Sequence, residues 1–115
     1  MLRTMLKSKI HGATVTQTEL YYTGSITLPP ELIKAADLLD GEQVDVVNMN
    51  NGNRLTTYVI EGEPGSTTVC LNGPAARTAT VGDIVHVIGY GLLDEDEVAR
   101  LTPAIVHVDA DNHVQ

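Results

Sequence analysis

Short runs with β-strand character, separated by turn residues, recur along the chain and set the strongest limit on its fold. There are six: Ala13 to Val15, Gln43 to Asn48, Arg54 to Glu61, Thr67 to Leu71, Ile84 to Tyr90 and Ile105 to Asp109. This length and spacing favour a small barrel or sandwich. Because 115 residues suit one core, residues 1–115 are predicted to form a single domain. The core is expected to be aliphatic, since Trp and Phe are absent.

A hairpin is predicted where an Asn-Asn-Gly sequence, residues 50–52, joins two of these runs. Asn and Gly tolerate the positive φ angles that a tight hairpin turn requires. Because side chains alternate along a strand, Arg54, Thr56 and Tyr58 should share one face of the second strand. Thr57 should lie on the opposite face.

Two short helices are predicted. The first begins at Pro29-Pro30-Glu31 and ends at Asp40-Gly41, with an apolar face made of Leu32, Ala35, Ala36 and Leu39. The second spans residues 94–100, where Asp94 can cap the helix and Glu97 occupies the capping-box position. Residues 109–113 are predicted to be a solvated tail.

The composition excludes several classes of function. A formal net charge of −8 with only seven basic residues disfavours a nucleic-acid surface and requires a locally basic pocket for any anionic ligand. Cys70 is the sole cysteine, so no internal disulfide can form, and its apolar surroundings predict a buried, inert thiol. No apolar stretch is long enough to span a membrane, and the first seven residues do not resemble a secretory signal. A cytoplasmic protein without a membrane partner is expected. The histidine spacing predicts no metal site.

The dipeptide Gly24-Ser25 is the centre of the functional hypothesis, although an ordinary turn is the usual interpretation of such a pair. A second copy at Gly65-Ser66 shows how readily it occurs. The surrounding sequence distinguishes the first copy. Five separated blocks matter: Met1 to His11; Tyr22-Thr23-Gly24-Ser25; Asn51 to Arg54 with Thr57-Tyr58; Gly65-Ser66 with Asn72 to Ala76; and Val81 to Val85. In this order, the blocks resemble the aspartate alpha-decarboxylase family.

The resemblance covers nearly all of the chain and implies a small six-stranded double-psi β-barrel that assembles as a homotetramer. It also implies self-cleavage into residues 1–24, the β chain, and residues 25–115, the α chain. A Ser hydroxyl can attack the preceding carbonyl of a strained turn, and Gly24 leaves that carbonyl unshielded. Elimination and hydrolysis would then convert Ser25 into a pyruvoyl group. Such a group forms a Schiff base with an amino acid and acts as an electron sink, as pyridoxal phosphate does.

The resemblance implies that the enzyme decarboxylates L-aspartate to β-alanine for pantothenate biosynthesis, without a metal or pyridoxal phosphate. It assigns Thr57 as an oxyanion donor during cleavage and Tyr58 as the proton donor during turnover. The implied substrate-binding residues are Lys9, His11, Arg54, Thr57, Asn72, Gly73, Pro74 and Ala75. Arg54 and Lys9 suit carboxylates because a guanidinium or ammonium group binds them by charge-assisted hydrogen bonds.

Four positions depart from the family pattern: Gly12, Tyr21, Val47 and Pro74. Proline lacks an N–H, so neighbouring residues must supply any donor expected from position 74. Two alternatives stay open: a non-catalytic barrel that binds another macromolecule, and a decarboxylase of a different acidic amino acid. An accessory maturation factor is a further partner to be tested.

Overall fold

The computed structural model describes all residues from Met1 to Gln115 and is mainly β, as predicted. Its eight strands are β1 (Arg3–Thr14), β2 (Gln17–Glu19), β3 (Ser25–Leu28), β4 (Gln43–Asn48), β5 (Arg54–Glu61), β6 (Cys70–Asn72), β7 (Ile84–Leu93) and β8 (Ala104–His107). The helices are α1 (Pro30–Ala35), a 3-10 helix η1 (Gly73–Thr78) and α2 (Glu95–Arg100). Six strands were expected, and β2 and β3 are the two that lie outside the six predicted runs. No helix combines the length and the apolar character needed to cross a membrane.

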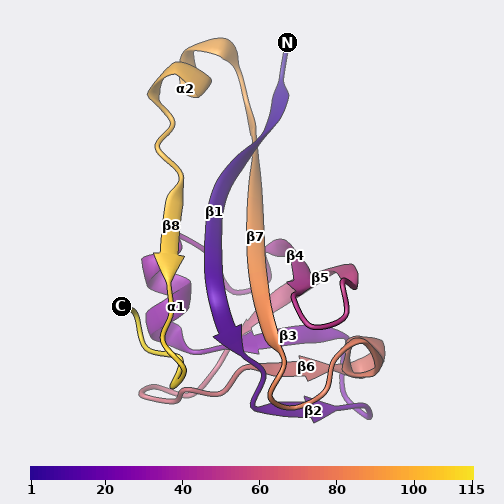
Figure 1. Cartoon of the computed structure of the whole chain (residues 1–115). Helices are drawn as coiled ribbons and strands as arrows, with labels where there is room; N and C mark the ends of the chain where they lie inside the picture. The colour runs from indigo at the N-terminus through magenta and orange to yellow at the C-terminus, as the bar shows by residue number, and fades with distance from the viewer.

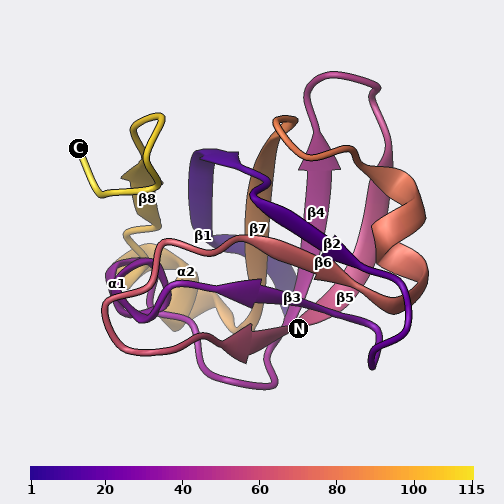
Figure 2. The same ribbon diagram turned by 90° about the horizontal axis from the view of Figure 1, so that it is seen from below.

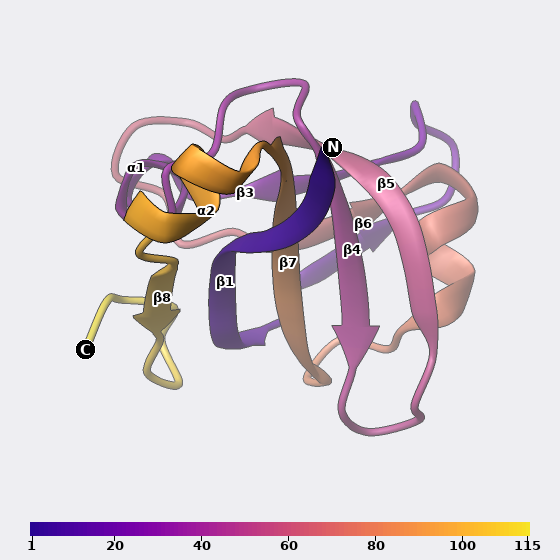
Figure 3. The same ribbon diagram turned by 90° about the horizontal axis from the view of Figure 1, so that it is seen from above.

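The strands pair in the order β2-β6-β3-β5-β4-β7-β1-β8. In Figure 1, β1 and β7 form a long upright pair with β8 beside β1, while β3, β6 and β2 lie across the base. Figure 3 shows β1, β7, β4 and β5 side by side, and Figure 2 shows β3, β6 and β2 crossing beneath them. Because β5 pairs antiparallel with β4 and parallel with β3, it joins these two layers.

The space between the layers is filled by aliphatic side chains. Inward residues of β1, β7 and β4 are aligned by the strand register, so that Ile10, Val87 and Val46 form one buried row. Ile26 from β3 and Leu71 from β6 close the core from the other side. No aromatic residue belongs to the buried core, which confirms the expected aliphatic interior.

Several local predictions are confirmed. β4 and β5 have the predicted bounds, and Gly52 takes a positive φ of 77° in the turn between them. α2 has the predicted capping box: Asp94 accepts from the Glu97 amide, and the Glu97 carboxylate accepts from the Asp94 amide. Cys70 is buried, as expected.

The first helix is shorter than predicted. α1 ends at Ala35 because Asp37 adopts a left-handed conformation, with a φ of 53°, and reverses the chain. This reversal places Leu38 in the core and leaves Leu39 73% exposed. Ala35 is also exposed, so two of the four predicted apolar-face residues do not pack inward.

Two predicted strands begin elsewhere. β1 starts at Arg3, ten residues before the predicted Ala13, because the long β7 provides a partner along its whole length. β6 starts at Cys70 rather than at Thr67. Val69, directly before β6, forms hydrogen bonds with both the backbone amide and the hydroxyl group of Thr16.

The C-terminal segment is not the solvated tail that was predicted. Asn112 is 1% exposed and has a left-handed φ of 63°. Its Oδ1 accepts from the Thr14 amide at 2.8 Å, and its Nδ2 donates to the carbonyls of Thr14 and Thr67 at 2.9 and 3.0 Å. One carboxamide therefore ties the C-terminal segment to two distant parts of the chain.

Replacing Asn112 by Ala should lower the free energy of unfolding by about 2 kcal/mol or more, because three backbone groups lose their partner. Asn112→Asp should also destabilise, since a carboxylate would face two carbonyl oxygens. Chemical denaturation measures both effects. Asp111→Ala is the control, because the Asp111 side chain is exposed and makes no hydrogen bond. Equal midpoints for Asn112→Ala and Asp111→Ala would contradict this role.

Candidate active site

Ser25 is the first residue of β3 and is completely buried. It pairs across the antiparallel β3–β6 ladder with Asn72. The Ser25 hydroxyl donates to the Thr23 carbonyl at 2.9 Å and accepts from Asn72 Nδ2 at 2.9 Å. Since a hydroxyl oxygen has one proton and two lone pairs, these two bonds fix its orientation and leave one lone pair free.

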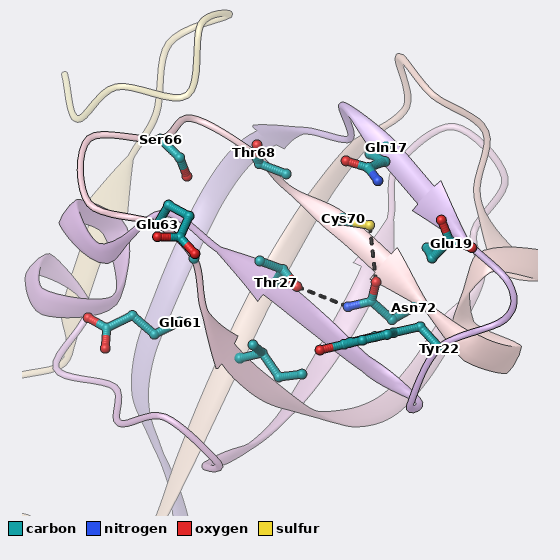
Figure 4. A pocket seen from close by; sticks show the side chains of 12 residues that line it. Gln17, Glu19, Tyr22, Thr27, Glu61, Glu63, Ser66, Thr68, Cys70 and Asn72 are labelled. Carbon is teal, nitrogen blue, oxygen red and sulfur yellow. Dashed lines mark hydrogen bonds between the residues drawn. The ribbon is translucent and has the colours of Figure 1, made fainter.

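The buried carboxamide of Asn72 connects Ser25 to its surroundings. Nδ2 also donates to Thr27 Oγ1 at 3.0 Å, and Oδ1 accepts from the Cys70 thiol at 3.1 Å (Figure 4). Burial, and then the nearby Glu19 carboxylate, raise the pKa of the Cys70 thiol, so it stays protonated and serves as a donor. All the polar atoms of the Asn72 side chain are therefore occupied in holding Ser25 and its neighbours.

Gly24 and Gly73 meet backbone to backbone. Gly73 begins η1 with a φ of 65°, and a Cβ atom at this position would lie 2.8 Å from Gly24 Cα and from the Tyr22 carbonyl oxygen. A methyl group cannot fit at that distance from backbone atoms. The absence of a side chain at Gly73 therefore lets the loop that precedes Ser25 lie against η1.

Two cavities flank this loop. The first, of about 360 Å³, is drawn in Figure 4, and its lining includes three carboxylates, those of Glu19, Glu61 and Glu63. Their negative charge disfavours an anionic ligand there. The second cavity, of about 410 Å³, has no acidic residue in its lining: Gly24, Leu55, Thr56, Thr57, Tyr58, Pro74, Ala75 and Thr78.

The second cavity has chemically useful groups on its wall. The hydroxyls of Thr57 and Tyr58 have no hydrogen-bond partner within the chain, so both are available to a ligand. Gly24 also lines this cavity, beside the Pro74 ring. Five predicted site residues line this cavity, and Ser25 and Gly73 adjoin it through Gly24, whereas Asn72 lines the first cavity.

Arg54 lies on the same strand as the cavity residues but does not line the cavity. Its guanidinium donates to Asp45 Oδ2 at 2.9 Å and to the Tyr90 hydroxyl at 3.3 Å. Thr56 donates to the other Asp45 oxygen at 2.7 Å. The Tyr90 and then the Asp45 hydrogen bonds raise the pKa of Arg54. A charged, partly anchored guanidinium is thus present near the cavity.

Lys9 and His11 are on β1, which is separated from β5 by β7 and β4. The register aligns four residues of these strands in one row: His11, His86, Val47 and Arg54. Three strand spacings amount to about 14 Å, so a single chain keeps His11 away from Arg54. Neither Lys9 nor His11 lines either cavity.

Sequence reasoning missed three residues that hold the site: Thr27, Asp45 and Tyr90. Thr27 lies two residues after Ser25, and this spacing places both side chains on one face of a strand. The contacts of Asp45 and Tyr90 depend on the register between strands, which has no local signal. No cluster of three or more His, Cys, Asp or Glu residues is arranged to hold a metal ion.

The comparison with protein families agrees with this geometry. A model described as aspartate decarboxylase matches residues 1–115, which is the whole chain. Its match spans Ser25, Asn72 and the residues of the second cavity alike. The resemblance noted in the sequence is thus confirmed, and the chain belongs to the aspartate decarboxylase family.

Proposed function

We propose that this protein is the precursor of a pyruvoyl-dependent L-aspartate decarboxylase, which produces β-alanine for pantothenate biosynthesis. Family membership supports aspartate decarboxylation. The observation that carries the self-processing part is the Ser25 hydroxyl, which is buried and fixed by Asn72 beside a loop that Gly73 holds close. A buried serine held in one orientation next to a glycine carbonyl is suited to intramolecular attack.

Cleavage proceeds through groups of this chain. Ser25 Oγ attacks the Gly24 carbonyl carbon, and the peptide nitrogen leaves as an amine that takes the hydroxyl proton. The free Thr57 hydroxyl serves as a donor to the oxyanion of this step. β-Elimination then releases Gly24 as a carboxylate and leaves dehydroalanine, which takes up water and loses ammonia. The products are residues 1–24 and residues 25–115.

The residues around Ser25 fit the group that would form there, because Asn72 Nδ2 already donates to the Ser25 side chain. The pyruvoyl group supplies a carbonyl that accepts electrons when carbon dioxide leaves. Tyr58, whose hydroxyl is free, delivers a proton to the substrate carbon that loses the carboxylate. The amides of Gly73 and Ala75 bind substrate oxygens. Asn72 Nδ2, which now donates to the Ser25 hydroxyl, becomes available to an oxygen at the processing site once that hydroxyl is lost, whereas Pro74 shapes the wall without donating.

The carboxylates of aspartate bind Arg54, Lys9 and His11 in this proposal. Because Lys9 and His11 lie away from the cavity within one chain, their participation favours a site completed by a second copy. Exposed apolar residues on β1 and β7 support assembly, and Leu92 is 66% exposed. A homotetramer satisfies both features. The cytoplasmic location and an accessory maturation factor belong to the same proposal.

Intact-mass measurement of the purified protein tests self-processing. We expect a fragment ending at Gly24 and a fragment of residues 25–115 that carries a pyruvoyl group. Ser25→Ala should stay whole and inactive, because the attacking hydroxyl is absent. A wild-type chain that stays whole after prolonged incubation with cell extract, or an active Ser25→Ala enzyme, would argue against the mechanism and favour a binding protein.

Gly73→Ala should slow cleavage by about tenfold or more, because the new Cβ displaces the loop from η1. Gly65→Ala is the matched control: Gly65 also has a positive φ, of 78°, but a Cβ there would meet no atom within 4 Å. Both variants pay the strain of a left-handed residue, about 1 to 2 kcal/mol. Cleavage rates followed by gel electrophoresis should fall only for Gly73→Ala. Equal rates would contradict the steric role.

Tyr58→Phe should be cleaved normally yet lose roughly 10² to 10⁴ in turnover, because the proton donor is gone. Release of β-alanine by purified, fully cleaved enzyme measures this. Parallel assays with glutamate test the acidic amino acid that differs by one methylene group. Full turnover in Tyr58→Phe would remove the residue from its role, and faster turnover of glutamate would overturn the choice of substrate.

A further inference from the structure

Three histidines lie in one row across adjacent strands. The register pairs His11 of β1 with His86 of β7 and with His107 of β8. The His11 and His86 rings are stacked, with centroids 4.0 Å apart and planes 18° apart. The His107 ring is tilted on the other side, at 5.2 Å from His11. Figure 1 shows the three strands side by side. The His11 ring is therefore confined between two others.

His86 makes a second contact that His107 does not. β1 contains a bulge between His11 and Ala13, where the pairing with β7 slips by one residue. The bulged residue, Gly12, has a φ of 92°, and its amide donates to His86 Nδ1 at 3.0 Å. His86 thus fixes the backbone directly after His11 while its ring stacks against the His11 ring.

The protonation state follows from this contact. A nitrogen that accepts a hydrogen bond carries no proton, so His86 is neutral with its proton on Nε2. Burial, followed by His11 and Lys9, lowers the pKa of His86. Burial, followed by Lys9 and His107, lowers the pKa of His11.

Other strands add no free carboxylate to this face. The remaining charged side chains that share it by register are Asp45 on β4 and Arg54 on β5, and these two form an ion pair with each other. Besides His11, the titratable groups that share this face on β1 and β8 are Lys9 and His107. Within these strands, no free carboxylate on this face therefore favours a second positive charge in the histidine row.

We propose that His86 is a positioning residue for His11, which it holds by stacking and by accepting the hydrogen bond of the Gly12 bulge. The inference rests on the proposed function, in which His11 binds the substrate. Loss of the Gly12 contact frees the backbone beside His11 and weakens substrate binding, whereas the chemical step at Ser25 and Tyr58 is unchanged.

A pH dependence follows, with a definite sign. The arrangement is intact above the lowered pKa of His86, because Nδ1 is then free to accept. As the pH falls through that pKa, Nδ1 becomes protonated, the Gly12 bond is lost and a cation stacks against His11. The KM for aspartate should therefore rise on the acid side.

Two variants of His86 separate its contacts. Phe keeps a flat ring but has no acceptor, whereas Asn places an acceptor oxygen near the position of Nδ1 and does not titrate. His107→Phe is the matched control, because it makes the same change in the same row at a side chain without a hydrogen bond. Hydrogen exchange of the Gly12 amide reports the contact without any need for activity.

We expect Gly12 exchange to be about tenfold faster in His86→Phe, which corresponds to the loss of one hydrogen bond, and near the wild-type rate in His86→Asn and His107→Phe. The KM for aspartate should rise severalfold in His86→Phe with kcat within about twofold. In His86→Asn, the acid-side rise in KM should disappear. Unchanged exchange in His86→Phe overturns the contact, and faster exchange with an unchanged KM overturns the positioning role. An inactive, uncleaved wild-type protein instead overturns the proposed function.

Discussion

The structure depends on the double pairing of β5, which forms hydrogen bonds with β4 along one edge and with β3 along the other. Through these two ladders, the upright strands and the strands across the base enclose one aliphatic core. The same pairing brings Thr57 and Tyr58 to a cavity beside the loop that precedes β3. A strand that joins two layers is held on both edges, so groups at its centre have little freedom to move. The fold thereby places free hydroxyl groups near a fixed serine without a dedicated loop.

Local chemistry made part of the fold predictable. The Asn-Asn-Gly turn fixed the bounds of β4 and β5, and Asp94 with Glu97 predicted the cap of α2. Two of the errors came from long-range contacts. β1 starts early because β7 is long, and Asn112 is buried because its carboxamide binds the Thr14 backbone; periodicity cannot detect either partner. The third error was local: α1 stops early because Asp37 turns left-handed, which the apolar pattern does not indicate.

The candidate site was also predictable from the sequence only in part. Family resemblance pointed to Ser25, Thr57 and Tyr58, and the lining of the second cavity includes the last two, although they are consecutive residues of β5. The close contact between Gly73 and Gly24 could not be predicted from local sequence, because the two residues are 49 positions apart. The hydrogen-bond partners of Arg54, which are Asp45 and Tyr90, could not be predicted from the sequence either. An arginine in a strand carries no sign of which carboxylate faces it until the strand register is known.

A cut after Gly24 would not release the first 24 residues. β1 is within this segment and pairs with both β7 and β8. It contributes Ile10 and Ala13 to the buried core, and Val15, directly after β1, is buried as well. The cut enzyme would therefore persist as a two-chain complex held only by noncovalent contacts. Its unfolding would separate the chains, and refolding would become a bimolecular reaction that depends on concentration. Folding must then come first and cutting second, so the covalent chain is needed only once in the lifetime of the molecule.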